Sequence, residues 1–439
     1  MSERMLGWLG ILRLGLVQTA LGAVVVLTTA ALNRVMVVEH ALPATVPGAL
    51  VALHYAVQML RPRLGHGSDQ GGRRTPWIIG GMAVLGVGGV LAAAATAWMG
   101  TAPLPGLLLA VVAFLLVGLG VGAAGTSLLV LLAARVAPAR KPASASIVWI
   151  MMIAGFVVTT AITGRLLDPY SGERLVTVTA AVALIAFIVS VLAVAGVEGA
   201  TASNDRAPPV PSRFKDALRE VWDEPVARHF TLFVFVSMLA YSAQDLILEP
   251  FAGAVFGMSL GESTQLSSVQ HGGVLAGMIL IAIVGSVTRG GTHVLRGWIV
   301  GGCLMAFGVL ITLAFAHMSG SEFPLGSAFF ALGVANGAFA AAAIATMMQL
   351  VGNGRQGREG VRMGMFGAAQ AIAFGVGGFL GTIVLDVGRL ITGSVTGGYS
   401  VVFLVDAALF LASALLALRI GQASGAGRPG FGRAAPAAP

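Results

Sequence analysis

Residues 65–74 read Gly-His-Gly-Ser-Asp-Gln-Gly-Gly-Arg-Arg, a short polar segment between two long apolar runs at about residues 44–65 and 76–99. A helix that crosses a membrane needs about 20 mostly apolar residues, so each run is long enough to cross. Loops rich in lysine and arginine resist translocation, and this segment ends in Arg73 and Arg74. It therefore predicts two membrane-spanning helices joined by a cytoplasmic loop.

The same alternation continues along the 439-residue chain. It predicts twelve spans, at about residues 12–38, 44–65, 76–99, 105–134, 144–167, 174–196, 228–251, 263–287, 297–318, 324–351, 362–386 and 398–419. With a cytoplasmic N-terminus, 22 of the 26 lysines and arginines fall on one side, leaving Arg34, Arg165, Arg174 and Arg389. Another helix count would scramble this asymmetry, so we expect an all-α integral membrane protein with both termini cytoplasmic. A cleaved signal peptide is disfavoured, because the first apolar run is long and eleven more follow.

The composition excludes several other classes of protein. The chain is 57% hydrophobic and only 10% charged, too few charges to cover a soluble surface. The net charge of +8 is spread over many loops, which indicates anionic lipid rather than nucleic acid as the neighbour. Cys303 is the single cysteine, so no disulfide forms within the chain. No nucleotide-binding loop, metal-ligand spacing or catalytic triad is present, and we expect neither enzymatic activity nor a required cofactor.

The longest polar stretch divides the chain in two. Residues 197–227 are predicted to form a cytoplasmic linker with a short amphipathic helix, between six-helix halves at 1–196 and 228–420. Residues 421–439 are rich in glycine, alanine and proline, and are predicted to be a disordered tail.

A weak internal repeat supports the two halves. The third and ninth spans open with similar segments, Trp77-Ile-Ile-Gly-Gly and Trp298-Ile-Val-Gly-Gly. The fifth and eleventh spans both end near an aspartate, Asp168 and Asp386. Parallel six-helix repeats related by an axis normal to the membrane are one architecture of secondary transporters.

The loop between the second and third spans carries the pattern Gly65-x-x-x-Asp69-x-x-Gly72-Arg73-Arg74. It resembles the signature loop of the major facilitator superfamily, which implies the major facilitator fold. The resemblance also implies that the Asp69 carboxylate binds near the start of the eleventh helix, where the helix dipole favours negative charge. The arginines would then hold the two halves together as a cytoplasmic latch. Gln70 departs from the family pattern of Arg or Lys, and the simpler alternative is a glycine-rich turn with topology-setting arginines.

Four further segments narrow the resemblance: Leu32-Asn33-Arg34-Val-Met-Val-Val-Glu39, Gln244-Asp245-Leu-Ile-Leu-Glu249-Pro250-Phe251, Arg61-Pro62 and Arg73-Arg74-Thr75-Pro76-Trp77. Together they resemble the PucC-type bacteriochlorophyll-delivery family over essentially the whole chain. The resemblance implies a transporter or delivery factor for bacteriochlorophyll, or a precursor, that supports assembly of light-harvesting complexes. It also implies a bacterial cytoplasmic or intracytoplasmic photosynthetic membrane, with antenna polypeptides and pigment-synthesis enzymes as partners beside the pigment and the lipid bilayer.

The residues themselves agree with a large apolar ligand. The spans are nearly free of charge, whereas a carrier of sugars or amino acids needs buried polar groups to replace substrate hydration. Two alternatives stay open: a conventional major facilitator carrier of another amphipathic solute, and a scaffold that gathers antenna polypeptides without transporting anything.

Four residues on the first and seventh spans form a predicted central cavity and outer gate: Asn33, Arg34, Asp245 and Glu249. Arg34 and Glu249 lie at matching depths, and an unpaired charge within a membrane is costly, so we expect them to form an ion pair. Asp245 is a competing partner. The alternative is that Arg34 reaches the outer interface and pairs with Glu39 or water.

Two histidines lie well inside spans, His54 on the second and His271 on the eighth. A neutral imidazole can ligate the Mg²⁺ of a bacteriochlorophyll, so both are pigment-binding candidates. Counted from Gly65 and Gly285, both lie near mid-membrane in corresponding helices. Gly272 and Gly273 would leave room for a flat macrocycle beside His271. The alternative is that each histidine only hydrogen-bonds a neighbouring helix.

Overall fold

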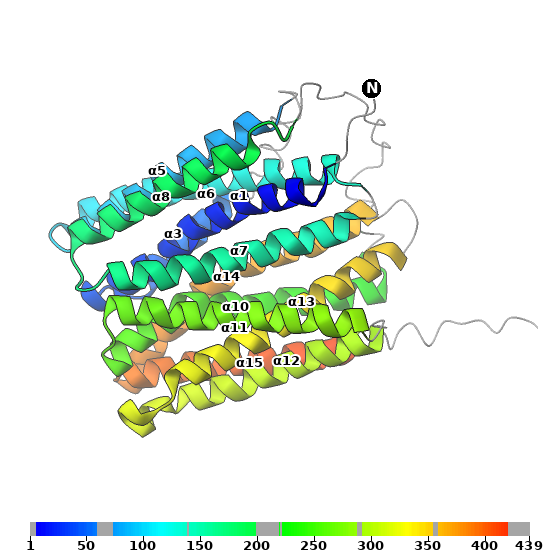
Figure 1. Cartoon of the computed structure of the whole chain (residues 1–439). Coiled ribbons are helices and arrows are strands. Elements are labelled where there is room, and N and C mark those ends of the chain that lie inside the picture. Colours follow the sequence, from blue (N-terminus) through cyan, green and yellow to red (C-terminus); the bar gives the residue numbers. More distant parts are fainter. Residues whose placement is uncertain are drawn as a thin grey trace, which may run out of the picture.

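The computed structural model describes residues 6–58, 73–137, 140–198, 219, 222–287, 292–353 and 359–419. Throughout these ranges the regular structure is helical and no strand occurs. The helices run side by side in one bundle (Figure 1). Eleven described segments are long and apolar enough to cross a membrane, and a shorter apolar helix, Thr45–Val57, stands at the position of the second span. The predicted all-α membrane fold is confirmed.

The first half contains α1 (Trp8–Val26), η1 (Leu27–Ala31), α2 (Leu32–Arg34), η2 (Val35–Glu39), α3 (Thr45–Val57), α5 (Thr75–Met99), α6 (Pro103–Arg135), α7 (Lys141–Leu166) and α8 (Gly172–Val194). The second half contains α10 (Pro225–Phe256), α11 (Leu260–Val287), α12 (Thr292–Ala314), η5 (Ala316–Glu322), α13 (Leu325–Asn353), α14 (Glu359–Thr392) and α15 (Val395–Arg419). Most of the predicted amphipathic helix of the linker lies outside the described residues, although Arg219 and Trp222 are described and helical. The predicted C-terminal tail lies wholly outside them.

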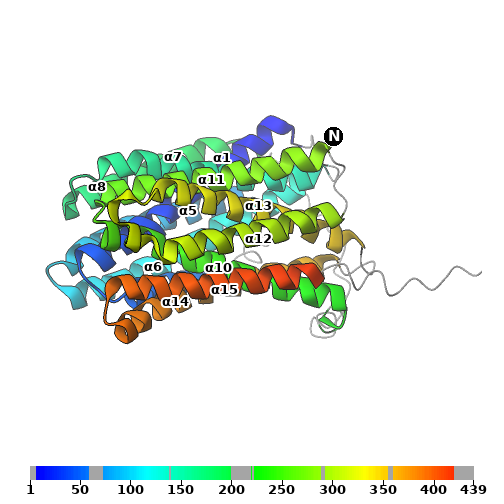
Figure 2. The ribbon, with the colours of Figure 1, turned by 90° about the horizontal axis from the view of Figure 1, so that it is seen from below.

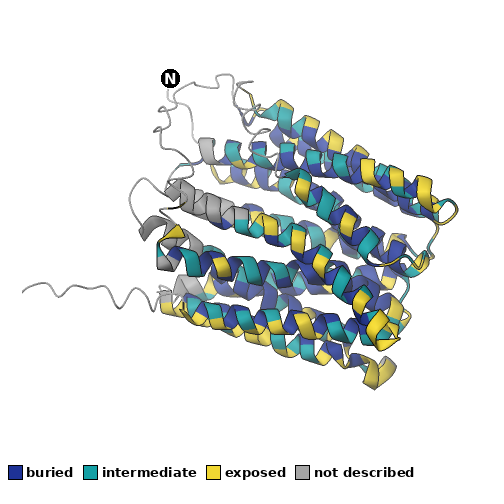
Figure 3. Ribbon diagram, turned by 180° about the vertical axis from the view of Figure 1, so that it is seen from behind, coloured by how far each residue is buried: buried dark blue, intermediate teal, exposed yellow. Residues whose placement is uncertain are grey.

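Large apolar side chains cover much of the outside of the bundle. On α8, Leu184, Ile185 and Leu192 are between 60% and 67% exposed, and Figure 3 shows exposed positions along the outer helices. In water such a surface would drive aggregation. The same surface is the expected one for helices that face lipid, because hydrocarbon solvates these side chains as well as a protein core does.

The same helix contacts occur in both halves. α5 packs on α6 and α8, as α12 packs on α13 and α15, and α1 packs on α7 as α10 packs on α14. The largest contacts between the halves are those of α7 with α11 and of α14 with α3, so each half contributes two helices to them. Figure 2 shows α11 beside α7, and Figure 1 shows α7 and α14 in the middle of the bundle. The pattern agrees with the repeat that the sequence predicts.

Glycines allow α11 and α13 to cross backbone against backbone. Gly273 and Gly277 on α11 face Gly333 and Gly337 on α13. A Cβ atom built on any of the four would come within 3.0 Å of a backbone carbonyl oxygen on the other helix. Small residues four apart are the usual way for membrane helices to approach closely. The contact between α11 and α13 therefore leaves no space for a side chain at these four positions.

The first spanning helix is not a uniform α-helix. Two π-helical turns, η1 and η2, flank the single turn α2 that carries Asn33 and Arg34. π-Helical turns are rare and often mark functional positions, because they widen the helix and shift the side chains that follow. A continuous α-helix was the prediction for residues 12–38, so the register beyond Val26 differs from the expected one.

Candidate functional site: a cavity between the two halves

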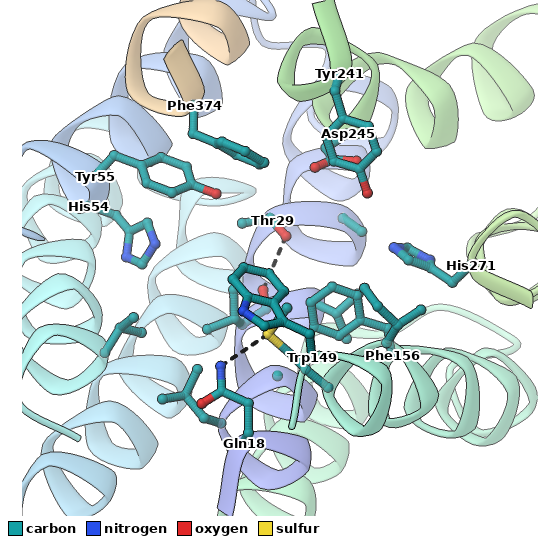
Figure 4. Close-up of a pocket in the computed structure, with 18 of the residues that line it drawn as sticks. Gln18, Thr29, His54, Tyr55, Trp149, Phe156, Tyr241, Asp245, His271 and Phe374 are labelled. Atoms are coloured by element: carbon teal, nitrogen blue, oxygen red, sulfur yellow. Dashed lines mark hydrogen bonds between the residues drawn. The ribbon is translucent and has the colours of Figure 1, made fainter. Parts of the chain in front are cut away.

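A cavity lies between the two halves of the bundle (Figure 4). Its volume is about 330 Å³, and about 1670 Å³ when the space that opens from it is included. Ligand pockets commonly occupy about 300–1,000 Å³. Polar and aromatic side chains from both halves line it: Gln18, His54, Tyr55, Gln58, Trp149 and Phe156 from the first, and Tyr241, Asp245, Glu249, Ser267, Gln270, His271, Gln370 and Phe374 from the second.

Both predicted histidines line this cavity, from opposite halves. His54 is buried on α3, and its Nε2 lies 2.8 Å from the side-chain nitrogen of Gln58, one turn along the same helix. His271 is buried on α11, where its Nδ1 lies 2.8 Å from the carbonyl oxygen of Ser267. The ring of Phe156, from α7, stands edge-on to His271 at a centroid distance of 5.1 Å. The two histidines were predicted to lie near mid-membrane in corresponding helices, and in the structure both border the same cavity.

The expected role of the glycines beside His271 is wrong for one of them. Gly273 packs against the backbone of α13, so it offers no space to a ligand. Gly272 has no neighbouring atom within 4 Å of a built Cβ, but it is absent from the cavity wall. The signal in the sequence was the spacing of Gly273 from Gly277, which is typical of helix packing.

Asn33 connects the first span to the seventh. Its amide nitrogen donates to the carbonyl oxygen of Leu246 on α10, at 2.6 Å. Pro250 lies four residues after Leu246 inside the same helix and has no N–H to satisfy that carbonyl. In a membrane a freed carbonyl needs another donor, and Asn33 supplies it. The proline and the asparagine therefore act together to fix the contact between the halves.

Asp245 and Glu249 lie one turn apart on α10, and both line the cavity. Glu249 is almost fully buried, and one of its carboxyl oxygens accepts a hydrogen bond of 2.5 Å from the Ser267 hydroxyl on α11. The predicted placement of both acids at the central cavity is present in the structure.

The predicted ion pair between Arg34 and Glu249 is wrong. Arg34 instead forms its ion pair with Glu39, and it donates a hydrogen bond of 2.6 Å to the Met258 carbonyl oxygen. Its guanidinium lies over Gly253, one turn beyond Glu249. The reason is the π-helical turn η2, in which residues five apart come into line and so place Glu39 beside Arg34. The alternative partner at the end of the helix is the one that the structure shows.

Two aspartates join the halves at the face of the bundle where α7 and α14 end. Asp168, just after α7, accepts hydrogen bonds from the Ser259 hydroxyl (2.6 Å) and the Gly261 N–H (2.9 Å) at the start of α11. Asp386, in the last turns of α14, accepts hydrogen bonds from the N–H groups of Ala44 (3.1 Å) and Thr45 (2.8 Å) at the start of α3. We call these contacts the two clasps.

The two clasps were not predicted, although the sequence contains a signal for them. An aspartate near the C-terminal end of a helix is disfavoured by the dipole of that helix, so it is expected to find positive potential elsewhere. The start of another helix supplies that potential together with unpaired N–H groups. Sequence reasoning used Asp168 and Asp386 only as markers of the repeat.

Most of the predicted cytoplasmic latch lies outside the described residues, namely Gly65, Asp69 and Gly72. Arg73 is exposed, and the backbone N–H groups of Arg74 and Thr75 donate to the carboxylate of Glu198, with 2.8 Å from Thr75. Burial tends to raise the pKa of Glu198. The hydrogen bonds from Arg74 and Thr75, with the charge of Arg73, outweigh it and lower the pKa below its ordinary value. Glu198 thus caps the start of α5, a role that sequence reasoning missed.

Replacing Glu198 by glutamine is expected to lower the melting temperature at neutral pH by about 2–4 °C, because hydrogen bonds to a charged acceptor are lost. A carboxylate whose pKa is lowered by folding stabilises the protein above its unfolded pKa of about 4.3 and loses that effect as the pH falls through the folded pKa. The difference between Glu198→Gln and wild type should therefore shrink in acid. Thermal unfolding in detergent at several pH values measures it, with the exposed Glu322→Gln as control. A difference that stays constant with pH would contradict the charged cap.

The chain has the major facilitator fold. It is similar to a peptide transporter solved in complex with sulfate, with a TM-score of 0.70, 13% identity and coverage of 97% of both chains. It is also similar to a bacterial homologue of the human lysosomal transporter Spinster, with a TM-score of 0.68, 15% identity and coverage of 94% and 97%. At these identities the similarity shows the fold.

The sequence identifies the family. Residues 31–425 match the PUCC protein family, and the chain belongs to it. It is 50% identical to the "Bacteriochlorophyll synthase 44.5 kDa chain" of Rhodobacter capsulatus, over 96% of this chain and 98% of that protein. It is 28% identical to "Protein PucC" of the same species, over 93% and 91% of the two chains. The protein is thus an integral membrane protein of the PucC family with a transporter fold.

Proposed function

We propose that this protein binds bacteriochlorophyll, or a biosynthetic precursor, in the cavity between its halves and delivers it for assembly of light-harvesting complexes. The observation that carries the proposal is the cavity itself, in which two histidines and a few polar groups are set among apolar and aromatic side chains. The name of the 50% identical relative, a bacteriochlorophyll synthase chain, supports the pigment as the ligand.

The chemistry of the cavity wall suits a large amphipathic ligand. Ligand sites of this kind are mostly apolar, with a small number of placed polar groups that fix the orientation. Leu21, Val25, Met152 and Phe374 supply apolar wall, while Gln18, Gln58 and Gln370 supply groups that can hydrogen-bond ring carbonyls or esters. The cavity volume of about 330 Å³ is small for a whole pigment with a hydrocarbon tail. We infer that the polar ring system enters the cavity and that the tail lies in the space that opens from it.

We further propose a carrier or delivery role without enzymatic activity. The fold is that of transporters, in which a ligand site near mid-membrane is exposed by relative movement of the two halves. The printed name of the relative contains the word synthase, and a subunit that hands pigment to or from a synthesising enzyme would be consistent with that name. The cytoplasmic orientation and the photosynthetic membrane are part of the same proposal.

Purification from the native membrane, followed by an absorption spectrum, tests the proposal. Bacteriochlorophyll or a precursor should copurify in about stoichiometric amount. Gly125 lines the cavity, and a built Cβ there meets no atom closer than 3.8 Å, so Gly125→Phe should fill the cavity and abolish the copurified pigment. Gly301→Phe, at an exposed glycine with open space around it, is the matched control and should keep the pigment. Antenna polypeptides without pigment would instead favour a scaffold, and an unrelated bound solute would favour a conventional carrier.

A further inference from the structure

We propose that His271 alone ligates the central metal of the tetrapyrrole, through Nε2, and that the cavity thereby selects metallated pigments over metal-free ones. The inference rests on the proposed function and adds the residue, the atom and the selectivity. It follows from the hydrogen bonds of the two histidines, which differ although both side chains line the same cavity.

The hydrogen bond to Ser267 fixes the protonation of the His271 ring. A carbonyl oxygen can only accept, so the Nδ1 atom, 2.8 Å away, carries the proton and donates it. In a neutral imidazole the other nitrogen, Nε2, then holds a lone pair. Histidines that ligate metals commonly show this arrangement: one ring nitrogen binds the metal, and the N–H of the other donates to an acceptor such as a backbone carbonyl.

The Nε2 atom of His271 is directed at the cavity. Figure 4 shows the imidazole pointing from α11 into the space bordered by Phe156 and Asp245. Within the described part of the chain, no protein hydrogen bond reaches this nitrogen. This nitrogen borders the cavity and holds a lone pair, so it can ligate a metal ion at the centre of a bound macrocycle.

The ring of Phe156 restricts where the imidazole can turn. It comes from α7 in the other half and meets the imidazole edge-on, with an interplanar angle of 85°. The hydrogen bond on one side and the aromatic ring on the other hold the imidazole in one orientation. A ligand that is held before the metal arrives costs less entropy on binding.

His54 lacks this arrangement. Its Nε2 is already engaged by the side-chain nitrogen of Gln58 at 2.8 Å. Its Nδ1 is enclosed by protein atoms, so a ligand in the cavity does not reach it. The ring also packs edge-on against Tyr55, with centroids 4.8 Å apart. His54 therefore contributes to the cavity wall through its hydrogen bond with Gln58 rather than through a nitrogen open to a metal.

Binding of a matched pair of pigments to the purified full-length protein tests this inference. The probes are bacteriochlorophyll a and bacteriopheophytin a, which differ in that the second has two protons in place of the metal. Wild-type protein should bind the metallated form at least about tenfold more tightly, equivalent to about 1.4 kcal/mol. His271→Phe should lose this preference, so that it binds the metallated form no more tightly than the metal-free form. His54→Phe should keep the preference.

A second variant separates ligation from folding. In His271→Gly, added imidazole should restore both the affinity for the metallated pigment and the visible absorption band that reports axial coordination, with no effect on the metal-free form. A wild-type protein that binds both pigments equally, or a preference that disappears in His54→Phe and survives in His271→Phe, would overturn the inference. A wild-type protein that binds neither pigment would instead overturn the proposed function.

Discussion

Gly273→Val is expected to prevent most of the protein molecules from folding, because the new side chain meets the backbone of α13. A Cβ at this position would come within 3.0 Å of the Phe330 carbonyl oxygen, and a backbone oxygen cannot rotate out of the way. Overpacking of a tight contact commonly costs about 1–3 kcal/mol. Here three more glycines, Gly277, Gly333 and Gly337, lie at the same helix crossing, so the two backbones cannot easily move apart to make room. We expect the yield of monodisperse protein in detergent to fall by about tenfold or more.

The neighbouring glycine provides a matched control. Gly272 lies in the same helix, so valine there has the same effect on helix propensity, but a built Cβ meets no atom within 4 Å. Gly272→Val should therefore elute from a size-exclusion column in near wild-type amount. Equal yields of the two variants would show that α11 and α13 do not cross in direct contact.

Replacing both clasp aspartates by alanine is expected to separate the two halves at the face where α7 and α14 end. Each aspartate accepts two hydrogen bonds from the opposite half. Hydrogen bonds to a charged group contribute about 1.5–3 kcal/mol. If each clasp contributes about 1.5 kcal/mol, one substitution shifts the equilibrium between closed and open forms about tenfold, and the double variant about 100-fold.

Spin labels at the exposed positions Glu173 and Glu322, one in each half, can measure this separation in a Cys303→Ala background. The distance distribution should move to longer values in the double variant and less in either single variant. Glu262→Ala is the control, since Glu262 accepts a hydrogen bond from the Ser259 N–H within one half only. An unchanged distribution in the double variant would mean that other contacts keep this face closed.

The helices could be predicted because the thickness of the membrane sets the length of each apolar run, and because basic loops stay on the cytoplasmic side. The run that ends near Met99 and the basic turn at Arg73 needed no tertiary information. The cavity histidines were found for a similar reason. Depth in the membrane follows from position along a helix, and the repeat places His54 and His271 in corresponding helices, so both were expected near one level.

The errors concern rotation about the helix axis, which depth does not determine. Arg34 and Glu249 were matched by depth, but the π-helical turn η2 rotates the following residues and brings Glu39 to Arg34. Gly273 was expected to face a ligand, and its rotation points it at α13 instead. The protonation of the His271 ring depends on a carbonyl of its own helix, a contact that no sequence pattern identifies.

The two clasps form one isologous contact repeated inside a single chain. Asp168 of the first half binds the start of α11, and Asp386 of the second half binds the start of α3, the corresponding helix. A contact related by two-fold symmetry has to occur twice, as in a dimer of identical subunits. The partner of each acid is largely main chain, so sequence change at Ala44 or Thr45 leaves the donor in place unless proline enters. Gly261 is different, because a Cβ atom there would meet the Asp168 carboxylate itself. Loss of one acid leaves its symmetry mate intact, and the halves would then turn about that remaining contact as a pivot.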